Sequence, residues 1–400
     1  MSLKTLLIKS FMYASTSLAL VMKPIYQVAT KRRLSSQQKN ICVIRLDKTV
    51  GDTVMNSAFL QSLRMQNPDA RITLVVHRNS YALVEKSTIV DEIKIYNPGN
   101  SLKYSLINRL YKTLSFVIKE FSYIPDITIV PRYDEDHNAA FISLFTLAPQ
   151  RVAWTEKTTE RKSLLNYSFD RLSTTLVRSN VLRHEVERGV ELLNAAFNTQ
   201  LTERHDLDIW LTDEEVLAAT LKYQLSREGN YICLGLSSGH SVLKQWPLEY
   251  FAELAKKLYA EDNRRIFVLL GAKGDVVQGN QFIEMCGPEL PVVNLIAKTT
   301  LRETGAILKL CSLYVGNDSG NIHLASAAKI PVIGLYGSSC AHRFSPWGKL
   351  SHCIANEKEC GPCAQGHIID RCSTCIYDKP LCMYEITADQ VCEEIKNLSK

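Results

Sequence analysis

Residues 41–76 read ICVIRLDKTVGDTVMNSAFLQSLRMQNPDARITLVV, and this stretch predicts the fold of the chain. It opens with a short apolar run, Ile41–Leu46, of the kind that forms a buried parallel strand. A loop through Gly51-Asp52 follows, and apolar residues then recur at helical spacing. A second apolar run at 71–76 closes the unit. The stretch therefore predicts a β-α-β unit.

The same alternation continues along the chain and then restarts at residue 231. Further strands are expected at 92–96, 126–130, 231–236, 266–270, 292–295, 313–315 and 332–335. Helices are expected to begin at Asp213 and at Pro247, and a capping box at Thr387–Gln390 is expected to open a last helix. This order predicts an α/β protein with two doubly wound, Rossmann-like domains, at 41–212 and 213–400.

Ligands of such sheets bind beyond the carboxyl ends of the strands, so the chemistry is expected in the cleft between the two halves. The segment GNDSGNIH at 316–323 lies at such a strand end and opens a helix. Three backbone N–H groups are expected to point from that helix toward a phosphate: those of Ser319, Gly320 and Asn321. Gly320 admits the phosphate closely, and Asp318 suits a sugar hydroxyl. In the alternative interpretation, Asp318 or Ser319 caps the helix and His323 packs beneath it.

Lys244 lies in the loop 237–247, which follows the first strand of the second half. A lysine at this edge of the sheet can neutralise a departing diphosphate as a point charge. The alternative is a solvated surface lysine.

In the first half, Asp52 follows the strand that ends at Leu46. An aspartate at this edge can take a proton from an attacking hydroxyl. The alternative is an N-cap for a helix that begins at Thr53. Two acidic triplets, 134–136 and 206–208, follow no glycine-rich phosphate loop and are interpreted as solvated faces. The chain lacks the G-x-G-x-x-G and P-loop motifs, which argues against hydride transfer and P-loop hydrolysis.

The net charge of +6 is concentrated in an N-terminal tail. Residues 1–40 contain seven basic residues and no acidic one, so the remaining 360 residues have a net charge of −1. A nucleic-acid partner is therefore not expected. The longest uncharged run, Ser10–Met22, has 13 residues, fewer than the roughly 20 that span a bilayer. We expect a helix on an anionic membrane surface, aided by Lys31–Arg33, with a cleaved signal peptide and an inert tail as alternatives.

Eight of the twelve cysteines lie between Cys340 and Cys392, with a cysteine-rich segment at 353–382. Two C-x2-C pairs with a fifth cysteine beyond them suit a structural zinc or iron site. The candidate ligands are Cys360, Cys363, Cys372, Cys375 and Cys382. Reduced free thiols and disulfides are the alternatives.

These segments together resemble glycosyltransferase family 9, the heptosyltransferases that build the lipopolysaccharide core. Four motifs carry the resemblance, in the right order and spacing. They are RLDKTVGDTV at 45–54, HEVER at 184–188, KQWP at 244–247 and DSGNIH at 318–323. The resemblance runs from about Ile41 to the C-terminus.

The resemblance implies a GT-B fold, an ADP-heptose donor, inverting transfer without a metal or other catalytic cofactor, and a lipopolysaccharide inner-core acceptor. It assigns Asp52 as the general base, Lys244 to the donor phosphates and Asp318 to the heptose hydroxyls. The diphosphate site would be completed by Ser319, Gly320 and His323. An enzyme of this kind is expected in the cytoplasm, peripheral on the inner face of the cytoplasmic membrane.

Two departures from the family pattern bear on these roles. The loop 45–51 is one residue longer than usual, which bears on the placement of Asp52. Leu236-Ser237-Ser238 stands where the family often has Pro-Gly, so Ser238 is a further expected donor-binding residue and donor contacts can differ. Two alternatives stay open: a protein acceptor, as in the autotransporter-modifying branch with its cysteine-bound iron, and a non-catalytic paralogue that binds the nucleotide sugar.

Overall fold

The computed structural model describes residues 3–30, 38–97, 106–239, 241–361, 363 and 374–398. The first half contains helices α1 (Leu3–Thr30), α2 (Val50–Gln66), α3 (Leu106–Glu120), α4 (His137–Phe145), α5 (Glu160–Leu165) and α6 (Glu185–Phe197). Its strands are β1 (Asn40–Arg45), β2 (Arg71–His77), β3 (Glu92–Tyr96), β4 (Ile127–Val130), β5 (Gln150–Trp154) and β6 (Thr175–Val177). Short 3₁₀ turns include η1 (Arg78–Leu83), η3 (Glu156–Thr158) and η4 (Phe169–Leu172).

The second half begins at α7 and ends at α14. Its helices are α7 (Asp213–Lys222), α8 (Leu248–Glu261), α9 (Val276–Cys286), α10 (Leu301–Leu308), α11 (Gly320–Ala327), α12 (Ala341–Phe344), α13 (Leu381–Tyr384) and α14 (Ala388–Leu398). Its strands are β7 (Asn230–Gly235), β8 (Arg265–Leu269), β9 (Val292–Asn294), β10 (Cys311–Asn317), β11 (Val332–Tyr336) and β12 (Ser351–Ala355). Two 3₁₀ turns, η5 (Val242–Lys244) and η6 (Lys273–Asp275), precede α8 and α9.

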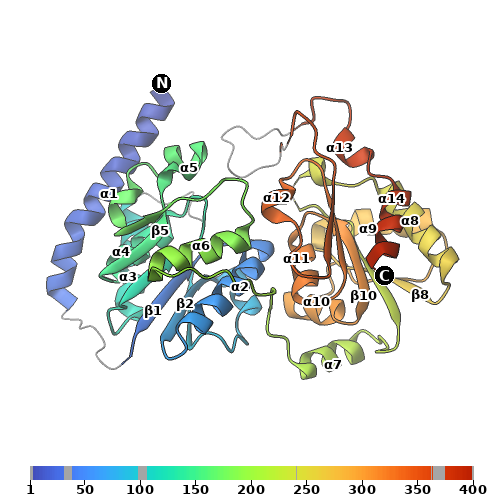
Figure 1. The fold of residues 1–400 in the computed structure, drawn as a ribbon, viewed down its shortest axis with the longest axis horizontal. Coiled ribbons are helices and arrows are strands. Elements are labelled where there is room, and N and C mark those ends of the chain that lie inside the picture. The colour runs from blue at the N-terminus through green and yellow to red at the C-terminus, as the bar shows by residue number, and fades with distance from the viewer. Residues whose placement is uncertain are drawn as a thin grey trace.

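Each half is built on a six-stranded parallel sheet, and the two halves lie side by side (Figure 1). The strand orders are β3-β2-β1-β4-β5-β6 and β12-β11-β10-β7-β8-β9. The strand order reverses between β1 and β4 in the first sheet and between β7 and β10 in the second. In such sheets, ligands bind at these switch points. The predicted doubly wound α/β architecture is confirmed.

Every strand expected from an apolar run is present, whereas β5, β6 and β12 were not predicted. The strand β12 is half-exposed at the edge of its sheet, so its sequence SHCIA carries no apolar run. The capping box at Thr387 is confirmed, because its backbone N–H donates to Gln390 Oε1 at 2.8 Å and its hydroxyl accepts from the Gln390 N–H at 3.2 Å. Pro247 is the N-cap of α8, so the helix begins one residue later than expected, at Leu248.

The two halves share one apolar core where α2 of the first meets α11 of the second. Val54, Met55 and Ala58 of α2 belong to the same buried cluster as Ile322 and Ala325 of α11. Beside it, Arg302 at the start of α10 donates to the carbonyl of Ala82 at 3.0 Å and to that of Trp210 at 3.1 Å. The cleft expected between the halves is therefore closed at its base in this structure.

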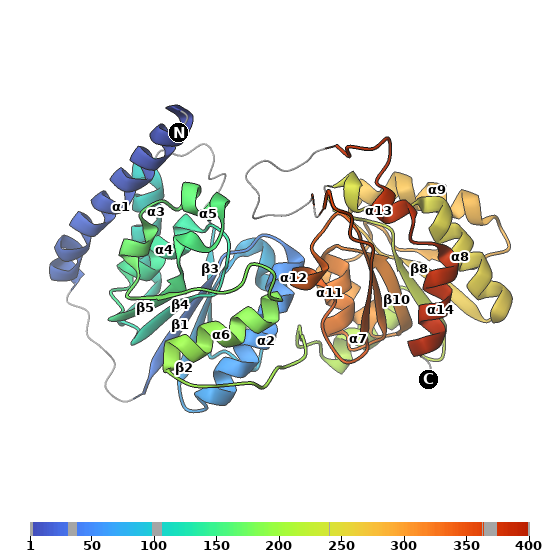
Figure 2. The same ribbon diagram turned by 45° about the horizontal axis from the view of Figure 1, so that its top comes forward.

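The N-terminal helix α1 lies along the outer flank of the first half (Figure 2). Its 22-residue portion Thr5–Tyr26 has a mean hydropathy of 1.4 and is long and apolar enough to cross a membrane, by length and composition alone. The expectation that the tail is too short for a span was therefore wrong. It counted only the uncharged run between Lys9 and Lys23, although the helix continues through both lysines. Residues 31–37, with the basic cluster Lys31–Arg33, lie outside the described part of the chain.

Candidate active site

Asp52 lies in the first turn of α2, at the carboxyl edge of the first sheet. The helix begins at Val50 and its N-cap is Thr49, so the alternative interpretation of Asp52 as an N-cap was wrong. The Thr49 hydroxyl donates to the Asp52 carboxylate, and an Arg45 guanidinium nitrogen lies 3.9 Å from it. The carboxylate is 32% exposed. Asp52 is thus oriented by two neighbours and still open to a substrate.

Asp47, the other carboxylate of this loop, is in a different environment. Its side chain is 1% exposed and forms ion pairs with both Arg45 and Arg132. The charge of Asp47 is the main reason that the pKa of Arg132 is raised. A carboxylate held between two guanidiniums and closed to solvent has no free face for an acceptor hydroxyl. Of these two aspartates, only Asp52 has a carboxylate that is open to solvent.

Lys244 and Asp318 meet across the carboxyl edge of the second sheet. Lys244 Nζ donates to Asp318 Oδ2 at 2.6 Å, and both side chains are largely buried. The solvated-lysine alternative was therefore wrong. Asn317, which sequence reasoning missed, holds the two loops together. Its Oδ1 accepts from the Trp246 N–H at 2.9 Å and its Nδ2 donates to the Leu236 carbonyl at 2.8 Å.

The start of α11 keeps its N-terminal N–H groups uncapped by side chains. Ser319 is the N-cap in an extended conformation, and its side chain makes no capping hydrogen bond. Asp318 is paired with Lys244 instead, so the capping alternative was wrong for both residues. Asn321 Nδ2 turns away to the Leu270 carbonyl at 3.3 Å. Free N–H groups at a helix N-terminus favour an anion.

His323 packs beneath this helix start, as the alternative interpretation expected. Its side chain is buried, and burial lowers its pKa to about 4. Asp318 and Asp52 both act in the opposite direction on that pKa. The imidazole therefore lies within electrostatic reach of one carboxylate from each half. The role of His323 in the diphosphate site stays a prediction.

The first turns of α2 and α11 are in close contact. A Cβ atom added to Gly51 would lie 2.7 Å from His323 Cδ2, and one added to Gly320 would lie 2.8 Å from Val50 Cβ. Real Cβ atoms do not approach other atoms so closely, so glycine is required at both positions for this contact. The two halves of the site are thus in direct contact.

Ser238 lies in the loop before η5, and its hydroxyl donates to the Ser241 carbonyl at 2.8 Å. This bond shapes the loop that carries Lys244. A donor contact by Ser238 itself stays a prediction.

Residues 128–371, more than half of the chain, match the family model described as glycosyltransferase family 9 (heptosyltransferase). The chain belongs to this family. It is 26% identical over 309 residues to lipopolysaccharide heptosyltransferase 2 of Salmonella typhimurium, covering 76% of this chain and 83% of that protein. It is 30% identical over 189 residues to lipooligosaccharide heptosyltransferase 2 of Campylobacter jejuni, where the match spans 45% of this chain and only 56% of the relative's length.

Among solved structures, the chain is similar to Escherichia coli ADP-heptose LPS heptosyltransferase II, with a TM-score of 0.67. The identity is 22%, and the match covers 90% of this chain and 98% of that one. Together with the two Rossmann-like sheets, this similarity shows the GT-B fold of the heptosyltransferases.

The cysteine-rich segment of this family 9 protein does not form the expected metal site among the residues that the structure describes. No group of three or more His, Cys, Asp or Glu side chains there is arranged to hold a metal ion. Cys363 Sγ contacts the Cys360 carbonyl and Cys375 Sγ contacts the Lys379 carbonyl, while Cys382 packs against Gly337. The thiols of Cys363 and Cys375 thus contact backbone carbonyls, while burial and the charges of Cys363, Cys375 and Cys360 raise the pKa of Cys382. Cys372, the fifth candidate ligand, lies outside the described residues.

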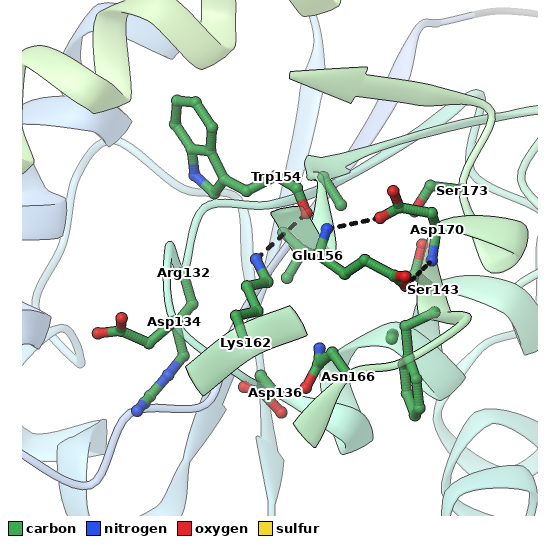
Figure 3. Close-up of a pocket in the computed structure, with 14 residues that line it drawn as sticks. Arg132, Asp134, Asp136, Ser143, Trp154, Glu156, Lys162, Asn166, Asp170 and Ser173 are labelled. Atoms are coloured by element: carbon green, nitrogen blue, oxygen red, sulfur yellow. Dashed lines mark hydrogen bonds between the residues drawn. The ribbon is translucent and has the colours of Figure 1, made fainter. Parts of the chain in front are cut away.

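The acidic triplet at 134–136 is not a solvated face, contrary to expectation. Asp136 Oδ1 caps α4 by accepting from the Ala139 N–H at 3.0 Å, and burial raises its pKa. Asp134 and Asp136 line a polar cavity beyond β4 and β5, with Trp154, Lys162 and Asn166 (Figure 3). The cavity holds about 30 Å³, enough for water but not for a sugar ring. In the second triplet, Asp206 is exposed as expected.

Lys162 shows why this cavity is part of the scaffold. Its ammonium donates to the Tyr133 carbonyl at 2.8 Å and to the Trp154 carbonyl at 3.2 Å. Burial lowers its pKa to about 8. Lys162 thus links the segment that follows β4 to the end of β5. This link lies next to Arg132, the partner of Asp47.

A buried ion cluster joins the two halves beside the site, and sequence reasoning did not find it. Arg343 of α12 pairs with Glu185 of α6 at 2.6 Å. Glu185 also pairs with Arg188, whose guanidinium lies 3.7 Å from the centre of the Tyr133 ring. The HEVER motif marked one side of this cluster. Its partner Arg343 is 158 residues away and had no signal of its own.

Proposed function

We propose that this protein transfers heptose from ADP-heptose to a sugar hydroxyl of a lipopolysaccharide inner-core acceptor. The observation that carries the proposal is the juxtaposition of Asp52 with the start of α11. Residues 41–212 would bind the acceptor and residues 213–400 the donor. The similar E. coli structure is described as an ADP-heptose LPS heptosyltransferase, which supports this donor and this class of acceptor.

The donor site is proposed at the carboxyl edge of the second sheet. The uncapped N–H groups of α11 would bind the diphosphate, and Lys244 would stand beside it as a point charge. Asp318 would accept hydrogen bonds from the heptose hydroxyls. In the structure Lys244 is paired with Asp318, so an incoming diphosphate competes for a cation that is already in place.

The transfer step is proposed to use Asp52 as the general base. The acceptor hydroxyl oxygen forms a bond to the anomeric carbon of heptose while the bond from that carbon to the diphosphate oxygen breaks. The hydroxyl proton passes to the Asp52 carboxylate, and ADP leaves with the electron pair. Attack from the side opposite to the leaving diphosphate inverts the anomeric configuration.

Charge on the leaving diphosphate is proposed to be stabilised without a divalent cation. Lys244 and the helix N-terminus supply the positive electrostatic potential that a metal ion would otherwise provide. Chelation is therefore expected to leave transfer intact, and recovery of a chelator-abolished activity by magnesium or manganese would contradict this part of the proposal.

The N-terminal helix is proposed to hold the enzyme on the cytoplasmic face of the cytoplasmic membrane. Seven basic residues within the first 40 would attract anionic headgroups at roughly 1 kcal/mol each when near the surface.

The proposal is tested by incubating the purified protein with ADP-heptose and a heptose-deficient core oligosaccharide. Mass spectrometry is expected to show a gain of one heptose on the oligosaccharide, and NMR to show the inverted linkage. Transfer only to a protein would favour the protein-acceptor alternative. No donor turnover with any acceptor, despite donor binding, would indicate a non-catalytic paralogue.

A further inference from the structure

The face that α1 turns away from the protein is more apolar than the face it turns inward. Six large apolar side chains on it are between 38% and 68% exposed: Leu6, Leu7, Phe11, Leu18, Val21 and Ile25. A helix that covers a water-soluble protein carries its polar residues on the outer face. The outer face of α1 is therefore unsuited to bulk water.

Two polar residues near the middle of α1 lie on the inner face, whereas Ser10 is exposed. Ser15 and Thr16 are buried together with Ala19 and Tyr26. The Thr16 hydroxyl shares a 2.7 Å hydrogen bond with the Ser168 hydroxyl. The most buried hydroxyls of the helix thus face the protein, while its large apolar side chains are exposed on the opposite face.

Both lysines in the described side chains of α1 also turn toward the protein. Lys9 Nζ lies 5.1 Å from the centre of the Tyr167 ring. Burial lowers the pKa of Lys23, and the charge of Arg151 lowers it further. Among residues 5–26, the outer face of α1 therefore contains no lysine, and the ammonium groups of Lys9 and Lys23 lie on the side of the protein.

The docking of α1 onto the first half is specific. Arg171 of η4 donates to Ser17 Oγ at 3.1 Å and lies 4.7 Å from the centre of the Tyr13 ring. Tyr26 packs edge to face on Phe145 of α4, with ring centroids 6.2 Å apart. Apolar side chains of α3 and α4 share a buried cluster with α1. Figures 1 and 2 both show α1 flat along this flank, remote from the second half.

We propose that α1 lies in the plane of an anionic lipid bilayer while docked on the first half, with its outer face in contact with the acyl chains. This inference rests on the membrane placement in the proposed function and adds how the helix sits. A helix that crossed the bilayer would have to leave its docking site and separate Thr16 from Ser168. The docked helix instead presses the acceptor-side half against the membrane.

A disulfide lock separates the two arrangements. Thr16→Cys with Ser168→Cys joins α1 to the domain at its closest polar contact, and mass spectrometry verifies the bond. Flotation with phosphatidylglycerol-containing vesicles is expected to show the same binding for the oxidised and reduced forms, within about twofold. Binding that is lost on oxidation and returns on reduction would overturn the docked arrangement and favour a spanning helix.

A second variant tests the outer face without a disulfide. Leu7→Gln, Val21→Gln and Ile25→Gln together are expected to weaken vesicle binding at least about tenfold, with an unchanged melting temperature because all three side chains are exposed. Leu221→Gln on α7, a residue 70% exposed on the other half, is the matched control and is expected to bind like the wild type. Undiminished binding of the triple variant would overturn the inference.

Transfer to a soluble oligosaccharide is measured for every variant. Absence of transfer in the wild type would refute the proposed function, whereas intact transfer with no binding of the wild type to anionic vesicles would refute only the membrane placement and the inference built on it.

Discussion

Replacing Asp52 with asparagine separates the proposed chemistry from a structural role. A positioned base contributes about 100-fold to 10,000-fold to a proton-transfer step. That factor corresponds to about 2.7 to 5.4 kcal/mol of activation free energy. Asparagine keeps the shape of the side chain and can still accept the hydrogen bond from the Thr49 hydroxyl, but it cannot take a proton.

The cost of this substitution to folding is smaller. Loss of the negative charge in the first turn of α2 removes about 0.3 to 1 kcal/mol of interaction with the helix N-terminus. The pair with Arg45, at 3.9 Å and beside a partly exposed carboxylate, contributes at most about 1 kcal/mol. A net loss of about 1 kcal/mol lowers the melting temperature by about 2 to 4 °C. The change in activation free energy therefore exceeds the change in stability.

The assay measures ADP release at saturating ADP-heptose and acceptor, beside calorimetry of donor binding. Asp52→Asn is expected to lower kcat at least about 100-fold with donor affinity within about twofold of the wild type. Thr49→Ala is the matched control, because it removes the hydrogen bond to Asp52 but keeps the carboxylate. This variant is expected to retain most of the activity. A kcat for Asp52→Asn within about threefold of the wild type would refute the role of Asp52 as base.

The remaining predictions concern the donor site and the buried charges around it. Lys244→Ala is expected to weaken the binding of both ADP and ADP-heptose about tenfold or more. Asp318→Ala is expected to weaken only ADP-heptose, because the substitution removes a sugar contact and frees Lys244 for the phosphates. Calorimetry showing equal effects of Asp318→Ala on both ligands would contradict this division. Asp47→Asn leaves the guanidiniums of Arg45 and Arg132 without their buried anionic partner. The substitution is therefore expected to lower the free energy of unfolding by about 3 kcal/mol, and a wild-type melting temperature would contradict this expectation. The pKa of His323 is about 4 in the folded state and 6.5 in the unfolded state, so the unfolded state takes up the proton first as the pH drops. The free energy of unfolding is therefore expected to fall by up to about 3 kcal/mol between pH 6.5 and pH 4. His323→Gln should make stability less dependent on pH in this range, and an unchanged dependence would show that other groups cause it.

The start of α2 shows where sequence reasoning reached its limit. The sequence placed Gly51 and Asp52 in a loop, and in the alternative interpretation Asp52 capped a helix from Thr53. In the structure Val50 packs against the start of α11, and α2 begins there. A contact between two halves of the chain decided the helix boundary, and no local pattern encodes such a contact.

The candidate site residues could be predicted where they belong to short sequence motifs. Lys244 and Asp318 each stand in a short motif after a buried strand, and the parallel topology brings those strand ends together. Arg343, which pairs with Glu185, belongs to no such motif, because this contact depends on how the two sheets are oriented. The edge strand β12 escaped prediction for a related reason, since half of its surface faces solvent and it needs no apolar run.

The close approach of α2 and α11 has an electrostatic consequence for the order of events. Each helix N-terminus carries about half a positive elementary charge, and here two such ends lie next to one another. Without an anion beside them, the two positive ends repel each other, which weakens the contact between the halves. In the proposed donor site, a nucleotide diphosphate would lie beside both ends and attract each of them, so donor binding would strengthen the contact between the halves. Departure of ADP would then restore the repulsion, so release of the product and separation of the halves would favour each other.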